Sequence, residues 1–166
     1  IREVLDLYRV HAGAAQLQLR LTPDLPEIAA DRVRIRQILN NLITNCLEAL
    51  EGRADPLIEI ETHSVNEAGA AMAEIVVADN GPGFQRELLG TVFDPYVTSK
   101  PKGTGLGLAI VKKIVEEHGG RIEAENLRTG GARVRILLPF GLDLAERARG
   151  GKSRDAGRPE LRRERA

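Results

Sequence analysis

The longest regular pattern in this chain is an apolar stripe between residues 31 and 50. Large apolar residues recur there every three or four positions, which predicts an amphipathic helix with one wide buried face. Asp31 is a suitable N-cap for this helix, and Gly52 is a suitable stop after it. The stripe consists of Ile35, Ile38, Leu39, Leu42, Ile43, Cys46, Leu47 and Leu50.

Alternating and continuous apolar runs predict strands on both sides of this helix. Apolar and polar residues alternate over residues 17–21 and again over 57–65, as in half-buried strands. Residues 71–78 form a more continuous apolar run, which favours a central strand. Residues 66–69 are then the hairpin loop between the second and third strands.

The second half of the chain predicts one more helix and one more hairpin. Helical spacing covers residues 105–118, and strand patterns cover 121–125 and 132–138. A short helical pattern also covers residues 1–8. This order predicts an α/β fold, a two-layer sandwich in which a mixed, mostly antiparallel sheet carries helices on one face.

Composition narrows the class of protein. The chain has 166 residues, enough for one domain with a substantial core, and only 3% of them are aromatic, so the core must be aliphatic. A formal net charge of zero argues against nucleic acid as a partner. The chain contains no apolar run long enough for a membrane span and no recognisable signal peptide, so we expect a cytoplasmic domain without membrane contact. Because it begins inside a helical pattern without an initiator Met, we expect a fragment of a longer protein.

The C-terminal part differs in composition from the rest. Residues 142–166 contain eight Lys or Arg and five Asp or Glu, with few large apolar residues. We therefore expect a domain over residues 1–141 and a charged, disordered and solvated tail after it. The single cysteine, Cys46, excludes an internal disulfide, and its place in the apolar stripe favours a buried filler over a reactive thiol.

A polar stripe opposes the apolar face of the long helix. Asn41 and Asn45 are four residues apart and therefore share a helix face, which Gln37 and Glu48 extend. Asn costs about 0.5 kcal/mol relative to Ala inside a helix, so helix formation alone does not explain why asparagines occupy these positions. Its amide oxygen is a suitable Mg²⁺ ligand when phosphates supply the negative charge. By itself, however, the stripe is better interpreted as a solvated face.

Two glycine-rich segments follow. Asp79 ends the central strand and could accept a hydrogen bond from an exocyclic amine, while Gly81 and Gly83 let the backbone approach a flat base. Gly103, Gly105 and Gly107 precede and enter the last helix, where free N–H groups at the positive helix end can face phosphate. Each segment alone is weak evidence, and neither a P-loop nor a dinucleotide-binding pattern is present.

Taken in order, these segments resemble the catalytic ATP-binding domain of two-component sensor histidine kinases, within the Bergerat-fold ATPase superfamily. The resemblance covers roughly residues 1–140, and the features around Glu48 and residues 95–100 are similar to the nitrogen-regulation sensor kinases. The matching segments are the N box at residues 36–49, the G1 box at 79–83, the F box at 93–96, the G2 box at 103–108 and the helix ending at 117–122.

The resemblance implies ATP and Mg²⁺ as cofactors and a role for each matching residue. Asn45 would coordinate Mg²⁺ with Asn41 assisting, and together with Lys100 they would be the catalytic residues. Asp79 would read the adenine amino group. Residues 85–102 would form an ATP lid that gates the γ-phosphate. The base pocket would be lined by Gly81, Gly83 and Phe84, and the phosphates would be bound by Lys100, Gly103, Thr104, Gly105, Leu106, Gly107 and Leu108.

Two departures from the family pattern bear on the chemistry. Glu48 stands where some relatives carry a basic residue, so a lysine–phosphate contact is not expected there. Asn41 stands where ATP-hydrolysing relatives have a Glu general base, and an amide cannot accept a proton from water. Neither His11, His63 nor His118 has the surroundings of a phosphoacceptor, so the acceptor histidine should lie upstream of this chain.

The expected activity is therefore transfer of the ATP γ-phosphoryl group to a histidine on an upstream dimerisation domain, for relay to a response regulator. The parent protein would be a homodimer, with a possible anchor in the inner membrane. Two alternatives stay open at this point: an ATPase of the same superfamily that drives a conformational change, and a module that only senses ATP or ADP.

Overall fold

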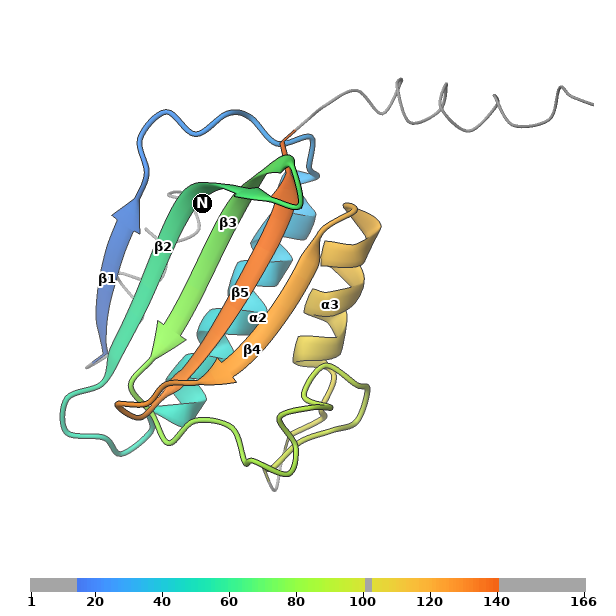
Figure 1. Ribbon diagram of the computed structural model, residues 1–166. Coiled ribbons are helices and arrows are strands. Elements are labelled where there is room, and N and C mark those ends of the chain that lie inside the picture. Colours follow the sequence, from blue (N-terminus) through green and yellow to red (C-terminus); the bar gives the residue numbers. More distant parts are fainter. Residues whose placement is uncertain (1–14, 101–102, 141–166) are drawn as a thin grey trace, which may run out of the picture.

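The computed structural model describes residues 15–100 and 103–140, which form a five-stranded sheet with two helices on one face (Figure 1). The expected N-terminal helix and the charged tail lie outside the described residues. The elements are β1 (Gln16–Leu21), α2 (Arg32–Ala49), β2 (Leu57–Glu67), β3 (Ala70–Asp79), α3 (Gly107–Glu117), β4 (Arg121–Asn126) and β5 (Ala132–Pro139).

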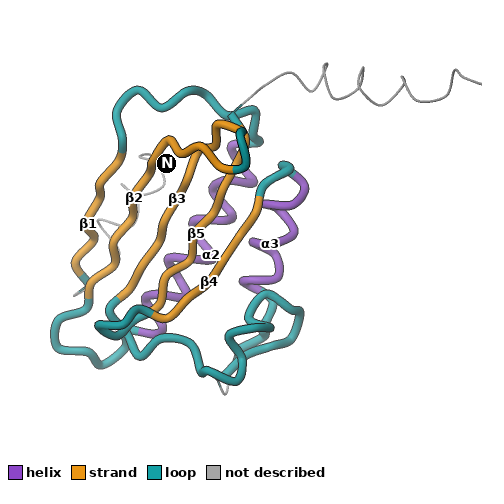
Figure 2. Tube along the Cα trace, in the orientation of Figure 1, coloured by secondary structure: helices purple, strands orange, loops and turns teal. Residues whose placement is uncertain are grey.

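The sheet has the order β1-β2-β3-β5-β4, with β3 in the centre as its apolar run predicts. β1 and β2 are parallel because α2 crosses between them, while the other three pairs are antiparallel. The expectation of a mixed, mostly antiparallel sheet with one helical layer is confirmed. Figure 2 shows both helices behind the sheet and the longest loop below it, between β3 and α3.

Alternation along the strands decides which face meets the helices. On β2, Ile58, Ile60 and Thr62 are buried, whereas Glu59 and Glu61 face away from the core. The buried side chains pack against the apolar stripe of α2, in which Ile38 and Leu39 have no exposed surface. The opposite face carries ion pairs across the strands, such as Arg135 with Glu74. One aliphatic core therefore lies between the sheet and the helices.

The bounds of α2 agree with the predicted signals. The Asp31 carboxylate accepts hydrogen bonds from the N–H groups of Val33 and Arg34, as an N-cap should. Leu50 caps the C-terminal end, and Gly52 follows with a φ of 77°. Gly52 thus lies in the left-handed region where glycine commonly ends a helix.

Two predicted boundaries are wrong. The loop between β2 and β3 is shorter than residues 66–69, because the strands continue to Glu67 and resume at Ala70. The last helix begins at Gly107 and not at residue 105. Gly105 has a φ of 66°, a left-handed conformation that cannot belong to a right-handed helix.

Candidate nucleotide-binding site

Three segments that carry the predicted site residues meet at one end of the sheet (Figure 1). β3 ends there at Asp79, the C-terminal turns of α2 lie behind it, and α3 begins beside them. They surround a cavity of about 800 Å³. The predicted residues that line it are Asn41, Asn45, Asp79, Gly83, Phe84, Lys100, Gly103, Thr104, Gly105, Leu106, Gly107 and Leu108.

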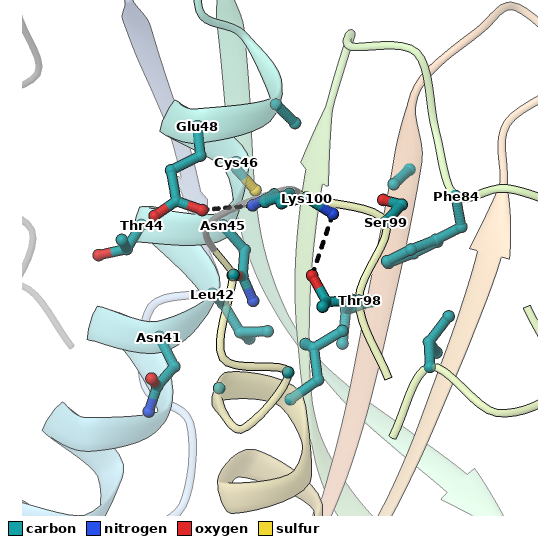
Figure 3. A pocket seen from close by; sticks show the side chains of 18 of the residues that line it. Asn41, Leu42, Thr44, Asn45, Cys46, Glu48, Phe84, Thr98, Ser99 and Lys100 are labelled. Atoms are coloured by element: carbon teal, nitrogen blue, oxygen red, sulfur yellow. Dashed lines mark hydrogen bonds and ion pairs between the residues drawn. The ribbon is translucent and has the colours of Figure 1, made fainter. Parts of the chain in front are cut away.

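The two asparagines of α2 project toward the start of α3. Asn41 Nδ2 donates a hydrogen bond to the Gln37 carbonyl at 2.9 Å, so the other side of its amide, Oδ1, is directed away from its own helix. A Cβ added to Gly107 would lie 3.5 Å from Asn41 Oδ1 and 3.6 Å from Asn45 Nδ2. Figure 3 shows Asn41 and Asn45 on successive turns of α2. Their amides and the first residue of α3 therefore face the same small space.

The start of α3 is open in the way that anion binding requires. Among the described residues no side chain caps the helix, and the N-cap position is occupied by Leu106 in a helical conformation. The N–H groups of the first turn have no partner within a helix and carry partial positive charge. These groups border the cavity, so they can donate hydrogen bonds to phosphate oxygens.

Asp79 lines the same cavity from the end of β3. The residue is 7% exposed, and its Oδ1 accepts hydrogen bonds from Gly81 N at 2.8 Å and from Ala132 N at 3.4 Å. Both donors engage the same carboxylate oxygen. The Cys46 thiol also hydrogen-bonds to this carboxylate. A carboxylate has about four acceptor positions, so Asp79 can still accept a hydrogen bond from a ligand in the cavity.

Gly81 does not line the cavity, in contrast to its predicted place in the base pocket. It is buried behind Asp79, where a Cβ would lie 2.8 Å from Asp79 Oδ1 and 3.2 Å from the Ala49 carbonyl oxygen. Glycine is needed here because the turn packs against α2, while its N–H orients the carboxylate. Gly83 and Phe84 form the wall instead.

The loop between β3 and α3 is built from two stretches in mutual contact. Tyr96 N donates a hydrogen bond to the Gly105 carbonyl at 2.9 Å, and a Cβ on Gly105 would lie 2.5 Å from the Tyr96 carbonyl carbon. Phe93 packs on the core, as the F-box resemblance implies, whereas Tyr96 is 78% exposed. Of the expected lid, residues 101–102 lie outside the described residues.

Lys100 reaches across the cavity to α2. Its Nζ forms an ion pair with the Glu48 carboxylate, while its backbone N–H donates to Thr98 Oγ1 at 3.1 Å (Figure 3). The residue that departs from the basic family pattern, Glu48, thus pairs with the lysine that was predicted to bind phosphate. A phosphate ligand would compete with Glu48 for Lys100.

Cys46 is a buried residue, as predicted, but it also lines the cavity. Burial raises the pKa of its thiol well above the ordinary value, and the nearby Asp79 carboxylate raises that pKa further by charge and hydrogen bonding. The thiol therefore stays protonated and unreactive at neutral pH.

The two described histidines have structural partners. His118 Nε2 accepts a hydrogen bond from Asp31 N at 3.3 Å, and its Nδ1 lies 2.7 Å from the Ile114 carbonyl oxygen, so the ring joins the end of α3 to the start of α2. His63 contacts Glu61 on the face of the sheet away from the helices. His11 lies outside the described residues.

Sequence reasoning gave no individual role to several residues around the cavity. Thr98 and Ser99 line it, and Asn126 hydrogen-bonds to Phe84 from a strand that was given no role. The run of polar residues before Lys100 was a local signal for the first two. Nothing local distinguishes Asn126, whose partner lies 42 residues away.

A metal ion at this site would need ligands from outside the protein. Among residues 15–100 and 103–140, no group of three or more His, Cys, Asp or Glu side chains could hold one. Neutral amide oxygens are weak ligands by themselves and suit Mg²⁺ that is already bound to phosphates. Within the same residues, no helix is long and apolar enough for a membrane span.

Comparison with known proteins finds a family model and several histidine kinases that are similar to this chain. The family model "Histidine kinase-, DNA gyrase B-, and HSP90-like ATPase" matches residues 30–142. Sensor histidine kinase ZraS of Escherichia coli O157:H7 is 39% identical over 144 residues, covering 86% of this chain and 30% of ZraS. Sensory histidine kinase/phosphatase NtrB of Rhizobium leguminosarum bv. phaseoli is 36% identical over 160 residues, covering 86% of this chain and 41% of NtrB.

A solved structure extends the comparison to the fold. The catalytic domain of histidine kinase ThkA superposes with a TM-score of 0.69 at 32% identity, covering 83% of this chain and 88% of that one. This chain spans less than half the length of ZraS or NtrB. It belongs to the histidine kinase-, DNA gyrase B- and HSP90-like ATPase family, and it is a homologue of the catalytic domain of sensor histidine kinases, with their Bergerat α/β fold.

Proposed function

We propose that this domain binds ATP and Mg²⁺ in the 800 Å³ cavity and transfers the γ-phosphoryl group to a histidine outside this chain. One observation carries the proposal. The amides of Asn41 and Asn45 face the uncapped start of α3 in the same cavity that contains the Asp79 carboxylate. A single ligand with an amine at one end and phosphates at the other fits both groups.

In this proposal the residues that line the cavity divide between the base and the phosphates. Asp79 accepts a hydrogen bond from the adenine amino group through the oxygen that Gly81 and Ala132 leave available. Phe84 and Gly83 contact the base. The first turn of α3, preceded by Gly103, Thr104, Gly105 and Leu106, donates N–H groups to the phosphates.

The donor set fits Mg²⁺ bound together with a triphosphate. Asn45 would supply an amide oxygen to the ion and Asn41 would assist, with phosphate oxygens completing the coordination. When bound, the ion neutralises charge that develops on the transferred phosphoryl group. Lys100 would add positive charge after leaving Glu48.

Phosphoryl transfer to histidine is favoured over ATP hydrolysis because of Asn41. This residue borders the proposed phosphate site with a neutral amide, which cannot take a proton from an attacking water. A neutral imidazole nitrogen is already nucleophilic and needs no such base. The two described histidines, His63 and His118, do not line the cavity.

We further propose that the acceptor histidine belongs to an upstream dimerisation domain of a homodimeric parent protein, which passes the phosphoryl group to a response regulator. The names of ZraS and NtrB support a sensor kinase as the parent protein, and the greater length of both relatives supports further domains in it. The domain would act in the cytoplasm, where ATP is available.

The decisive experiment is phosphotransfer in trans. The domain is mixed with the upstream helices of its parent protein and ATP labelled at the γ-phosphate, and acid-labile label on histidine is measured. We expect label with the wild-type chain and with Asn66→Ala, an exposed control on β2, but at least about 100-fold less with Asn45→Ala. Nucleotide binding without label would indicate a sensing module, and phosphate release without label would indicate an ATPase.

A further inference from the structure

Asn126, the last residue of β4, holds the backbone of a residue far away in sequence. Phe84 N donates to Asn126 Oδ1 at 2.7 Å, and Asn126 Nδ2 donates to the Phe84 carbonyl oxygen at 2.8 Å. Both polar groups of the Phe84 backbone are thereby satisfied by one side chain. A primary amide is suited to this because it offers a donor and an acceptor side by side.

The turn before Phe84 is shaped to this contact. Gly83 has a φ of 80°, and a Cβ there would lie 2.7 Å from Asn126 Oδ1 and 3.1 Å from the Gly131 carbonyl oxygen. The loop therefore lies directly against the ends of β4 and β5. Replacement of Gly83 by any other residue would strain the backbone and push it off Asn126.

The same strand ends also reach Asp79. Asn126 is paired with Ala132 in the β4–β5 ladder, and Ala132 N donates to Asp79 Oδ1. Phe84 and the Asp79 carboxylate thus bind to two residues that are paired in the sheet, and this pairing sets their relative position. At the other end of the turn, Asn80 Oδ1 accepts a hydrogen bond from Leu57 N, at the start of β2, at 3.0 Å. Asn80 Nδ2 donates to the Asp55 carbonyl oxygen, before that strand, at 2.7 Å.

We propose that Asn126 is a positioning residue for recognition of the nucleotide base. Asn126 does not line the cavity, whereas Phe84 and Gly83 do, so it acts through them. Its side chain holds the Phe84 wall at a fixed separation from Asp79, so that a base seated on the wall meets the carboxylate in hydrogen-bonding geometry. The inference rests on the proposed function, because it assumes that this cavity binds a purine nucleotide.

The first test compares nucleotide binding by the whole chain in four forms. These are the wild type, Asn126→Ala, Asn126→Asp and the exposed control Asn66→Ala, each titrated calorimetrically with ATP and ADP. We expect Asn126→Ala to weaken both nucleotides about tenfold, since two hydrogen bonds that order the wall are lost. Asn126→Asp keeps the acceptor for Phe84 N, so its affinity should lie between those of the wild type and Asn126→Ala. Asn66→Ala should bind as the wild type does.

The kinetics of phosphotransfer distinguish a positioning role of Asn126 from a role in folding alone. For Asn126→Ala, the KM for ATP should rise about tenfold while kcat at saturating ATP stays within about twofold, because the phosphate groups are held elsewhere. A residue that only supports the fold would lower Tm and the amount of active protein without changing KM. If Asn126→Ala does not fold, the same split is measured on Asn126→Asp.

Amide hydrogen exchange gives a readout that needs no nucleotide. The Phe84 amide should be protected in the wild type and in Asn126→Asp, and should exchange at least about tenfold faster in Asn126→Ala. Wild-type affinity, KM and Phe84 exchange in a folded Asn126→Ala chain would overturn this inference and leave the proposed function intact. A wild-type chain that binds neither ATP nor ADP would overturn both.

Discussion

The exchange of Asp79 for Asn tests base recognition with little damage to the fold. The Oδ1 atom of Asp79 serves Gly81 N and Ala132 N, and the Asn side chain offers the same oxygen to both. What changes is the second position, where an NH₂ donor replaces a carboxylate oxygen. In the proposed complex this donor faces the adenine amino group, which is also a donor.

The expected loss follows from that mismatch. A hydrogen bond to a charged group contributes about 1.5–3 kcal/mol, so affinity for ATP should fall roughly 10- to 150-fold. The free energy of unfolding should change by less than about 1 kcal/mol, because both backbone N–H groups keep their acceptor. Asp79→Ala removes that acceptor as well, so it should abolish most binding and also cost about 1–3 kcal/mol of stability.

Calorimetric titration with ATP and ADP, paired with denaturant unfolding of the same samples, measures both quantities. A matched control is Glu74→Gln, which removes a carboxylate from the same strand but on the face with Arg135, away from the cavity. We expect this control to bind nucleotide as the wild type does. If folded Asp79→Asn also bound ATP with wild-type affinity, the assignment of Asp79 to the base would be refuted.

Three further predictions concern the rest of the cavity. Gly107→Ala should fold normally, since the added Cβ would make ordinary contacts at 3.5 and 3.6 Å. It should bind ATP with Mg²⁺ at least about fivefold more weakly, because the methyl group fills the gap between the asparagines and α3. Unchanged affinity would contradict this. Glu48→Gln should release Lys100 and raise ATP affinity by up to about fivefold. The same exchange should have no effect in the Lys100→Ala background. Wild-type affinity of the single variant Glu48→Gln would exclude competition between Glu48 and phosphate for the lysine. The pKa of Cys46 is raised, so its thiolate is scarce until the pH is well above the pKa of an ordinary thiol. At pH 8, alkylation of the native chain should therefore be far slower than alkylation of the unfolded chain, and slower still with ATP. Rapid alkylation at pH 7 would contradict the buried, protonated state.

Local pattern was sufficient to predict the elements that form the core. The stripe from Ile35 to Leu50 is the buried face of α2, and the alternation from Leu57 onward separates the two faces of β2. Asp31 acts as an N-cap because it lies next to the N–H groups it serves. Such features depend on neighbours a few residues apart, so the sequence displays them directly.

The sequence-based predictions fail where the structure depends on backbone conformation or on a partner far away in the sequence. Helical spacing predicted a helix from residue 105, but Gly105 has a left-handed conformation and its carbonyl accepts a hydrogen bond from Tyr96 N, so α3 starts two residues later. The pairing of Glu48 with Lys100 and that of Phe84 with Asn126 connect positions 52 and 42 residues apart. Only the folded sheet brings these partners together.

The central claim is that one nucleotide spans the cavity from Asp79 to Asn45. A crystal structure of the chain with a non-hydrolysable ATP analogue and Mg²⁺ tests it most directly. We predict a single molecule whose exocyclic amine lies about 3 Å from the Asp79 carboxylate and whose phosphate-bound Mg²⁺ lies about 2 Å from Asn45 Oδ1. A nucleotide bound outside this cavity, or one seated with its phosphates toward Asp79, would contradict the claim.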